Sequence, residues 1–439
     1  MSNQFIGYHD PIKRSDEDTY PSKRTRLNLK ILFVVGQFPL LSETFILNQI
    51  TGLIDRGHEI HIYATRKISD VHHTDVDKYD LFNRTFFRME LPKGRFRSYF
   101  EAFKLACLIG KSKPVMLLRA LNAVIYSRRL SSLMIFFDLK SLADFASYDI
   151  IHCHFGYHGI RGMLLRETGV LRGKLVTTFH GYDISSGLKK TGPKFYNYLF
   201  EKGDLFLPIS ERWRQQLIEL GCDAKKIQVH RMGIDCRRLA FKPRVLETGG
   251  LLKIVTVARM VKKKGLEFGI RAFAMLKKVY DNVEYTIVGD GPLRAELTSL
   301  VNHLGIRDCV RIVGALEQNR VVEILEKSHI FMLPSVTATN GDQEGIPVVL
   351  MEAMAVGLPV VSTLHSGIPE LVEDGLSGFL VPEKDVNALF EKLKYLVENH
   401  QRWGEMGHHA RKIVQAHYDI NLQNDKLVDI FNRLLRLKN

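Results

Sequence analysis

The chain has 439 residues, and its 62 Lys and Arg against 48 Asp and Glu give a net charge of +14. With 45% hydrophobic and 25% charged residues, the composition is ordinary for a globular protein and excludes a wholly disordered, collagenous or coiled-coil chain. The length predicts two domains, since single hydrophobic cores stop growing near about 250–300 residues.

The sequence holds no apolar run near the roughly 18 residues that a membrane-spanning helix needs. Its start contains no apolar core of a secretory signal, so we expect no such leader. The five cysteines are widely spaced and form no Cys-x-x-Cys pair, which argues for a reducing cytoplasm and against disulfides or a structural zinc site.

Residues 1–27 are polar and without periodicity, and we expect a mobile tail there. Short apolar runs that alternate with helical stretches then predict a parallel sheet wound by helices. The strands expected in this half are Leu29–Val35, His58–Ala64, Asp149–His154, Lys174–His180 and Leu205–Ile209.

Pro243, Gly249 and Gly250 interrupt the alternation and predict an interdomain linker at 237–250. A second alternation follows, with strands expected at Leu252–Ala258, Val283–Gly289, Val310–Gly314, Ile330–Pro334, Pro359–Ser362 and Gly378–Val381. We therefore predict an α/β protein of two Rossmann-like, doubly wound domains, 28–236 and 251–415, that face a ligand-binding cleft. Residues 416–439 are expected to form a helix that returns to the first domain.

The stretch Gln343–Thr363 (QEGIPVVLMEAMAVGLPVVST) is the most informative part of the sequence. Pro347 suits the first turn of a helix, which puts Glu344 on the preceding loop and Glu352 inside the helix. Backbone N–H groups at a helix N-terminus bind phosphate, so the loop Gly345–Ile346 is a candidate anion site. A surface pair of glutamates is the alternative, but VVLMEAMA is too apolar for a surface helix.

This stretch resembles the Glu-x7-Glu motif of retaining GT-B glycosyltransferases of family 4, and the resemblance extends over residues 29–415. Further matching segments are Thr178–Asp183 (TFHGYD), Met232–Asp235 (MGID), Val257–Glu267 (VARMVKKKGLE), Thr286–Pro292 (TIVGDGP), His365–Glu370 (HSGIPE) and Gly375–Pro382 (GLSGFLVP). Phe38–Ile50 and His152–Gly156 resemble bacterial exopolysaccharide enzymes of the colanic-acid and amylovoran type. In one departure, GQFPLLSET follows the first strand where many relatives carry a Gly-Gly loop.

The resemblance implies a GT-B fold and a nucleotide-sugar donor bound by the second domain, with the acceptor on the side of the first. Negative charge builds on the donor diphosphate as the glycosidic bond breaks, and preorganised positive groups stabilise it. Arg259 and Lys264 are implied to supply them, so we expect neither a cofactor nor a required metal. The donor-binding set is Arg259, Lys264, Gly289, Gly291, Glu344, Gly345, Ile346, Pro347, Val348 and Glu352, and the catalytic set is His180, Glu344, Arg259 and Lys264.

Individual roles also follow from the resemblance. Glu352 is implied to accept hydrogen bonds from the ribose hydroxyls, Glu344 to hold the donor sugar, and His180 to act at the reacting face. Gly289 and Gly291 are expected to shape a tight turn rather than bind phosphate. The acceptor-side candidates are Glu43, His154 and Asp183. His152, His154 and Glu43 lie on predicted strand ends at the mouth of the cleft, and core packing is the alternative for these three.

Two clusters of charged residues have solvent-exposed surface as an interpretation besides a functional site. Lys262 and Lys263 are expected to form solvated basic surface, and this is also the alternative for Arg259 and Lys264. Asp75 and Asp77, beside His72 and His73, form a candidate metal pair, but we favour a solvated polar loop because Arg and Lys can replace the metal.

The charge is uneven along the chain. Residues 1–240 carry 37 basic and 24 acidic side chains, a net +13. Residues 93–129 hold nine basic side chains against Glu101 alone, interleaved with Phe and Leu, which is typical of an amphipathic element on an anionic membrane. A helix pair packed on the domain, with a solvated basic face, is the alternative.

We therefore predict a cytoplasmic hexosyltransferase, peripheral on the inner face of the cell membrane. It moves a sugar with retention from a UDP- or GDP-sugar to a lipid-linked oligosaccharide in exopolysaccharide biosynthesis. A same-fold enzyme with a soluble or different lipid acceptor, a non-catalytic scaffold and a basic nucleic-acid-binding protein are the alternatives. No nucleic-acid-binding motif occurs, so nucleic acid is not an expected partner.

Overall fold

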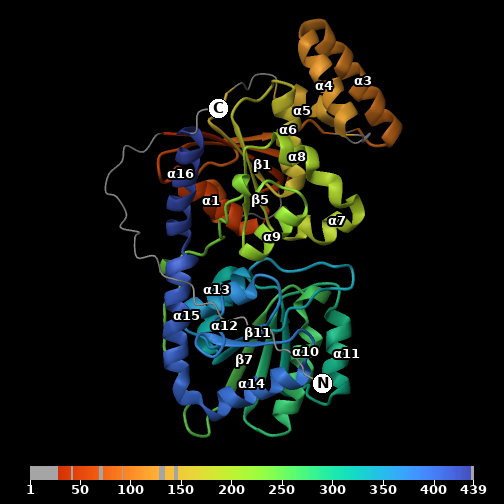
Figure 1. The fold of residues 1–439 in the computed structure, drawn as a ribbon. Coiled ribbons are helices and arrows are strands. Elements are labelled where there is room, and N and C mark those ends of the chain that lie inside the picture. The colour runs from red at the N-terminus through yellow and green to blue at the C-terminus, as the bar shows by residue number, and fades with distance from the viewer. Residues whose placement is uncertain are drawn as a thin grey trace, which may run out of the picture.

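The computed structural model describes residues 28–40, 43–68, 73–90, 92–127, 134–142 and 147–436, and the predicted tail at 1–27 lies outside them. Within these ranges the chain forms two α/β domains, each built on a six-stranded parallel sheet (Figure 1). This confirms the predicted fold class. No helix of the described residues is long and apolar enough to cross a membrane.

The first sheet has the strand order β3-β2-β1-β4-β5-β6. Its strands are β1 Lys30–Phe38, β2 Glu59–Lys67, β3 Thr85–Phe87, β4 Ile150–His154, β5 Lys174–Phe179 and β6 Leu205–Pro208. Consecutive residues Ile31, Leu32 and Phe33 are all fully buried, because helices cover both faces of the sheet. Strand β3 is not among the predicted strands, and it is only three residues long.

The helices of this half are α1 Thr44–Ile54, α2 Thr74–Lys78, α3 Arg95–Ser112, α4 Pro114–Ser127, α5 Ile135–Ser141, α6 Gly156–Glu167, α7 Ser186–Thr191, α8 Asn197–Lys202 and α9 Glu211–Glu219. Helices α3 and α4 form a hairpin that stands out from the domain on the side away from the second domain (Figure 1).

The second sheet repeats the same topology, because its order β9-β8-β7-β10-β11-β12 matches that of the first strand for strand. Its strands are β7 Leu252–Val257, β8 Val283–Val288, β9 Val310–Gly314, β10 Ile330–Leu333, β11 Val360–Thr363 and β12 Gly378–Val381. The helices in this half of the chain are α10 Leu266–Lys277, α11 Arg294–His303, α12 Gln318–Lys327, α13 Val348–Ala355, α14 Val386–Glu398, α15 Trp403–His417 and α16 Ile420–Arg436. In both sheets the strand order reverses beside the central strand, where ligands of such sheets bind.

The last two helices join the domains along one side of the molecule (Figure 1). Helix α15 packs on α13 of the second domain, and α16 packs on α1 of the first. Between the two helices, Ile234 exchanges backbone hydrogen bonds of 2.9 Å with Tyr418 and Ile420. Leu427 and Phe431 of α16 are fully buried in the core of the first domain.

The segment at 237–250 has no regular structure apart from its first turn, and it is tied to the second domain. The Arg244 guanidinium, which is almost fully buried, donates to the carbonyl oxygens of Glu326 and Val356, each at 2.9 Å. The chain therefore crosses between the domains along a fixed path.

Candidate active site

Glu344 lies on the loop between β10 and α13, where it forms a buried ion pair with Lys264. Lys264 Nζ is 2.9 Å from Glu344 Oε1, and the two side chains are only 12% and 8% exposed. Burial alone would raise the pKa of Glu344, but the positive charges of Lys264 and Lys263 outweigh this effect. The pKa of Glu344 therefore lies below its usual value. The carboxylate is therefore ionised at neutral pH and is available to accept hydrogen bonds.

His365 fixes the backbone of this loop. The Glu344 N–H donates to His365 Nε2 at 3.0 Å, while His365 Nδ1 lies 2.6 Å from Glu383 Oε1. Since Nε2 accepts, the ring proton is on Nδ1 and is donated to Glu383. The Ser366 hydroxyl donates to the Glu344 carbonyl at 2.7 Å, so both sides of the Glu344 backbone are held.

Lys263 corrects an expectation. We expected solvated surface, but its side chain is 13% exposed and its ammonium lies 3.3 Å from both Asp342 Oδ1 and the Gln343 carbonyl oxygen. Lys262 does lie on the surface, where it pairs with Glu296 at 2.9 Å. The turn at 262–264 directs Lys262 outward and both Lys263 and Lys264 inward, and the two inward lysines hold the loop that carries Glu344.

Arg259 follows strand β7 and is exposed. The turn beside it requires glycine: a Cβ at Gly289 would lie 2.0 Å from the Ala258 carbonyl oxygen, and one at Gly291 would lie 2.7 Å from that of Met260. Gly289 has a φ of 134°. This close approach of two backbones fixes where Arg259 leaves the sheet, and it agrees with a shaping role for both glycines.

Glu352 lies in α13, with Pro347 as the N-cap residue and Val348 as the first helical residue. Its Oε1 accepts a 2.8 Å hydrogen bond from the side-chain amide of Gln318, the first residue of α12. Burial raises the pKa of Glu352 to about 7, although the bond from Gln318 lowers it in part. Near neutral pH this carboxyl group therefore changes between donor and acceptor.

His180 and His154 form a stacked pair at the carboxyl edge of the first sheet. His154 ends β4, His180 follows β5, and their rings are 5.3 Å apart with His154 Nδ1 3.1 Å from His180 Nε2. Phe45 of α1 packs on His180 at 4.8 Å. Burial lowers the pKa of His180 to about 3 and that of His154 well below its usual value, so both rings are neutral. His154 has no exposed surface and lies beneath His180, which is partly exposed.

Asp183 organises the turn that presents His180. Its carboxylate accepts backbone N–H bonds from Gly156 at 2.8 Å, His180 at 3.1 Å and Gly181 at 3.0 Å. Because Asp183 is 0% exposed, this placement gives it a positioning role in the turn instead of direct contact with an acceptor.

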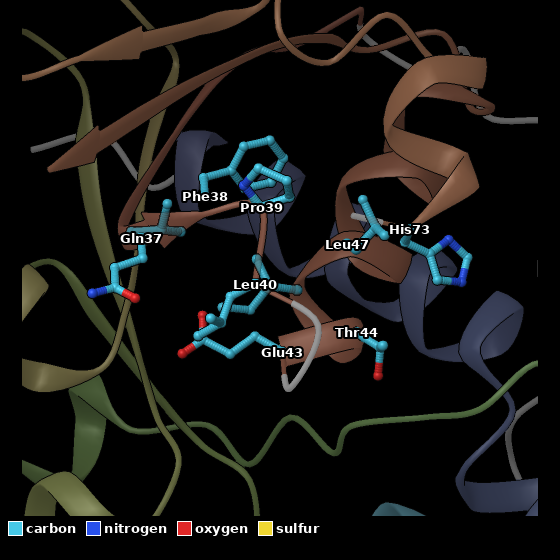
Figure 2. Close-up of a pocket in the computed structure, with 10 residues that line it drawn as sticks. Gln37, Phe38, Pro39, Leu40, Glu43, Thr44, Leu47 and His73 are labelled. Carbon is cyan, nitrogen blue, oxygen red and sulfur yellow. The ribbon is translucent and has the colours of Figure 1, made fainter. Parts of the chain in front are cut away.

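Glu43 lines a small, largely apolar pocket that is formed in part by the segment GQFPLLSET, where the sequence departs from many relatives (Figure 2). The pocket lies between the carboxyl end of β1 and the start of α1, and its lining includes Gln37, Phe38, Leu40, Leu47 and His73. Burial raises the pKa of Glu43 to about 7. Leu41 and Ser42 of this loop lie outside the described residues.

The two domains meet between the Glu344 loop and the His180 turn. A Cβ placed on Gly345 would lie 2.4 Å from Ile209 Cδ1 and 3.1 Å from the His180 carbonyl oxygen. After α13 and β11, the Glu370 carboxylate of the second domain accepts hydrogen bonds from the backbone N–H groups of Glu211 and Arg212, both at 3.0 Å, at the start of α9. The structure thus brings His180, Gly345 and Glu344 to one interface.

Asp75 and Asp77 do not lie in a loop, so that part of the expectation is wrong, although Asp77 is exposed as expected. They lie in helix α2, whose N-cap His73 accepts from the Asp75 N–H at 3.2 Å, and Asp75 is 7% exposed. His72 lies outside the described residues. Within the part of the chain that the structure describes, no group of three or more His, Cys, Asp or Glu side chains is placed to share a metal ion.

Sequence reasoning assigned no site role to Gln318, Lys263 or Phe45. Gln318 and Phe45 each contact a predicted site residue from a distant part of the chain, and Lys263 contacts the loop just before Glu344. No local pattern signals such contacts. Glu370 lies in HSGIPE, one of the segments that match the family. The match did not indicate that Glu370 contacts the other domain.

Comparisons with known proteins agree with this geometry. Residues 42–238 match the family model described as Glycosyltransferase Family 4, and residues 240–413 match Glycosyl transferases group 1. The putative colanic acid biosynthesis glycosyltransferase WcaL of Salmonella typhimurium is 42% identical over 83% of this chain and 90% of its own length. The amylovoran biosynthesis glycosyltransferase AmsK of Erwinia amylovora is 39% identical over 92% of this chain and all of its own.

Solved structures share the fold at lower identity. Anabaena HepE in complex with UDP superposes with a TM-score of 0.70 at 18% identity, covering 92% of this chain and all of HepE. A glycosyltransferase from Rickettsia africae gives 0.68 at 20% identity, covering 94% of this chain and all of the other.

Proposed function

The chain belongs to the family 4 glycosyltransferases of bacterial exopolysaccharide biosynthesis, and we propose that it moves a hexosyl unit from a UDP- or GDP-sugar, with retention, to a lipid-linked oligosaccharide. It works in the cytoplasm, peripherally on the inner face of the cell membrane.

The buried pair of Lys264 and Glu344 is the observation that carries this proposal. A donor diphosphate at the start of α13 would add negative charge beside Lys264. Its ammonium can then bind phosphate oxygens, while Glu344 accepts hydrogen bonds from the sugar hydroxyls. The same two groups therefore serve both ends of the bond that breaks.

Arg259 and Lys264 would stabilise the charge that develops on the leaving diphosphate. Arg can contact two oxygens at once, whereas Lys acts as a compact point charge. Charge stabilisation by fixed groups needs no reorganisation at the moment of reaction. We therefore propose a reaction that requires no metal and no cofactor.

Neutral His180 lies on the first-domain side of Gly345, and we assign it to the reacting face of the sugar. Retention is proposed from the resemblance to the Glu-x7-Glu motif. Structures of HepE with UDP and with UDP-glucose support a nucleotide-sugar as the class of donor.

A donor panel tests the proposal. Purified protein is incubated with UDP- and GDP-sugars, and release of the nucleoside diphosphate is followed with and without lipid extract as acceptor. Transfer with one donor, and an unchanged anomeric configuration in the product by NMR, is the expected result. No turnover or binding across the panel would overturn it, and an inverted product would overturn retention alone.

The cations are tested in the same assay. Arg259→Ala should lose roughly 10²–10³-fold in rate, the scale seen when one preorganised charge-stabilising group is removed. Arg311→Ala is the matched control, because Arg311 is exposed and pairs with Glu284 at the far edge of the sheet. Activity that requires a divalent ion would instead refute the metal-independent reaction.

A further inference from the structure

The hairpin of α3 and α4 exposes an unusual amount of apolar surface. Of 17 large hydrophobic side chains that are exposed among the described residues, eight lie on these two helices. Monomeric soluble proteins rarely expose contiguous apolar patches larger than a few hundred Å². Patches above that size mark sites that bind proteins, membranes or ligands. The hairpin packs on the domain through α5 and α6, so its outer surface is left to the solvent.

Helix α3 has apolar residues on two opposite faces. Ala102 and Leu105 are buried against the domain. Phe96, Phe100 and Phe103 follow one another at helical spacing on the other face and are 91%, 59% and 66% exposed. Helix α3 packs on the domain through its inner face, so packing within the domain does not explain the outer phenylalanines.

Helix α4 continues this surface. Ala120 of this helix is buried, whereas Val115, Leu118 and Ile125 are exposed on the opposite side, at 61%, 67% and 72%. The two helices together form one outer apolar face, which we call the hairpin face: Phe96, Phe100, Phe103, Val115, Leu118 and Ile125.

Basic side chains border the hairpin face. Arg97, Lys104 and Lys111 recur every seven residues, which places them in one exposed stripe beside the phenylalanines of α3. Lys93 and Arg119 are exposed as well. The one acidic residue at 93–129, Glu101, pairs with Lys104 at 2.9 Å. Arg128 and Arg129 lie outside the described residues.

We infer that the hairpin face docks on an anionic lipid bilayer, with the phenylalanines at the headgroup boundary and the basic stripe on the lipid phosphates. Aromatic and aliphatic side chains flanked by Lys and Arg are typical of helices that lie in a membrane interface. A protein partner fits less well, since protein–protein interfaces are depleted in lysine at their centre.

The inference rests on the proposed function only in that a lipid-linked acceptor gives the docking a purpose. The hairpin stands on the side of the first domain that faces away from the second (Figure 1). Docking there would hold the acceptor-side domain at the membrane. The second domain would remain free to move relative to the first.

Vesicle flotation tests the inference with the full chain. We expect binding to phosphatidylcholine vesicles that contain phosphatidylglycerol and little binding to pure phosphatidylcholine. Arg97→Glu with Lys104→Glu and Lys111→Glu should lower the bound fraction at least about tenfold, since each basic residue near an anionic surface adds measurably to binding. Phe96→Ser with Phe100→Ser and Phe103→Ser should remove the part of the binding that survives high salt.

Matched controls come from exposed positions on or next to the second domain. Lys278→Glu with Arg307→Glu and Lys327→Glu makes the same change in charge, and Val245→Ser with Val279→Ser and Leu376→Ser makes the same change in polarity. Neither set should change vesicle binding. Unchanged thermal unfolding and UDP titration of the hairpin variants would show that they fold.

A fluorescence measurement reports the contact directly. Phe100→Trp should show a blue-shifted emission on anionic vesicles and quenching by brominated lipid, against a background of two buried tryptophans, Trp213 and Trp403. Val279→Trp, on the second domain, should show neither.

Several outcomes would overturn the inference. Equal binding to neutral and anionic vesicles, or unchanged binding of both hairpin variants, would leave the face without a role in lipid contact. A dimer in sedimentation velocity that the serine variant converts to a monomer would identify the face as a contact between two chains. If the wild-type protein binds anionic vesicles but turns over no donor, the proposed function is refuted and the docking surface is still supported.

Discussion

The ammonium nitrogen of Lys264 lies 2.9 Å from a carboxylate oxygen of Glu344, although the two residues are 80 positions apart in the sequence. The motifs that contain them indicated separate roles, one at the diphosphate and one at the sugar. Their direct contact links the two roles, because any group that draws Lys264 away changes the charge around Glu344.

The pair predicts a non-additive effect on stability. Lys264→Met leaves a buried carboxylate without its main partner, and we expect the free energy of unfolding to fall by about 3–5 kcal/mol. Adding Glu344→Gln should restore part of this loss, because no buried charge then remains unpaired. Chemical denaturation of both single variants and the double variant measures the coupling; strictly additive losses would contradict it.

The same pair predicts a direction with pH. Because the folded protein holds the pKa of Glu344 below its usual 4.5, the ion pair contributes stability above that value, which is lost as the pH falls through the lowered one. The stability advantage of the wild type over Glu344→Gln should therefore shrink on acidification from neutral pH. Thermal unfolding of the two proteins in parallel buffers tests this, and a constant difference would refute the pairing.

Glu352 predicts donor binding that depends on pH near neutrality. Its pKa is raised to about 7, and the ionised form is the better acceptor for ribose hydroxyls, so affinity should rise as the pH passes that value. Calorimetric titration with UDP-glucose and GDP-mannose measures it, since their diphosphates do not titrate in this range. Glu352→Gln should bind more weakly and without this dependence.

Gln318 provides the control for that titration. Its amide lowers the pKa of Glu352, so Gln318→Leu should move the midpoint of the pH dependence upward. A wild-type affinity that is flat with pH, or a midpoint that Gln318→Leu does not move, would exclude Glu352 from donor binding.

His154 predicts an effect on turnover through His180. The contact of 3.1 Å orients the His180 ring, so His154→Leu should lower kcat about five- to tenfold, the value of one hydrogen bond, with little change in KM. His154→Asn keeps a polar group near Nδ1 and should recover part of the rate. If both variants lose only thermal stability, His154 is a core residue.

The sequence predicted most of the fold because its signals are local. Buried parallel strands appear as short apolar runs, and all but one of the strands were placed this way. The exception, Thr85–Phe87, is three residues long and too short to form a pattern. The residues of the Glu-x7-Glu motif could also be named in advance, since a loop and the helix that follows it are continuous in the chain.

What the sequence could not predict depends on contacts between distant segments. Lys263 has the same local signal as its neighbour Lys262, and only the turn decides that Lys263 points inward while Lys262 points outward. Likewise, the basic segment at 93–129 allowed either a packed helix pair or a surface for membranes. The structure shows a packed pair that still exposes a second apolar face, so the two interpretations are compatible.

The contacts of Glu370 predict that this residue acts as a clamp, which means that it holds the second domain against α9 of the first. Its carboxylate accepts two N–H bonds at the N-terminus of α9 and lies 3.1 Å from the guanidinium of Arg231. A carboxylate suits this position because the first N–H groups of a helix have no partner within it. Glu370→Ala should therefore raise KM for the donor and increase the radius of gyration in small-angle scattering, and the cap alone should cost about 1 kcal/mol of stability.

Glu373 is the matched control for the clamp, because it lies three residues further on and pairs with His409 of its own domain at 2.6 Å. Glu373→Ala should leave the radius of gyration and KM unchanged. Glu370→Gln should give a radius of gyration and a KM between those of Glu370→Ala and Glu373→Ala. An amide oxygen still accepts hydrogen bonds, but it carries no charge to pair with Arg231. If Glu370→Ala and Glu373→Ala give the same scattering curve and the same KM, the contact does not control how the domains close.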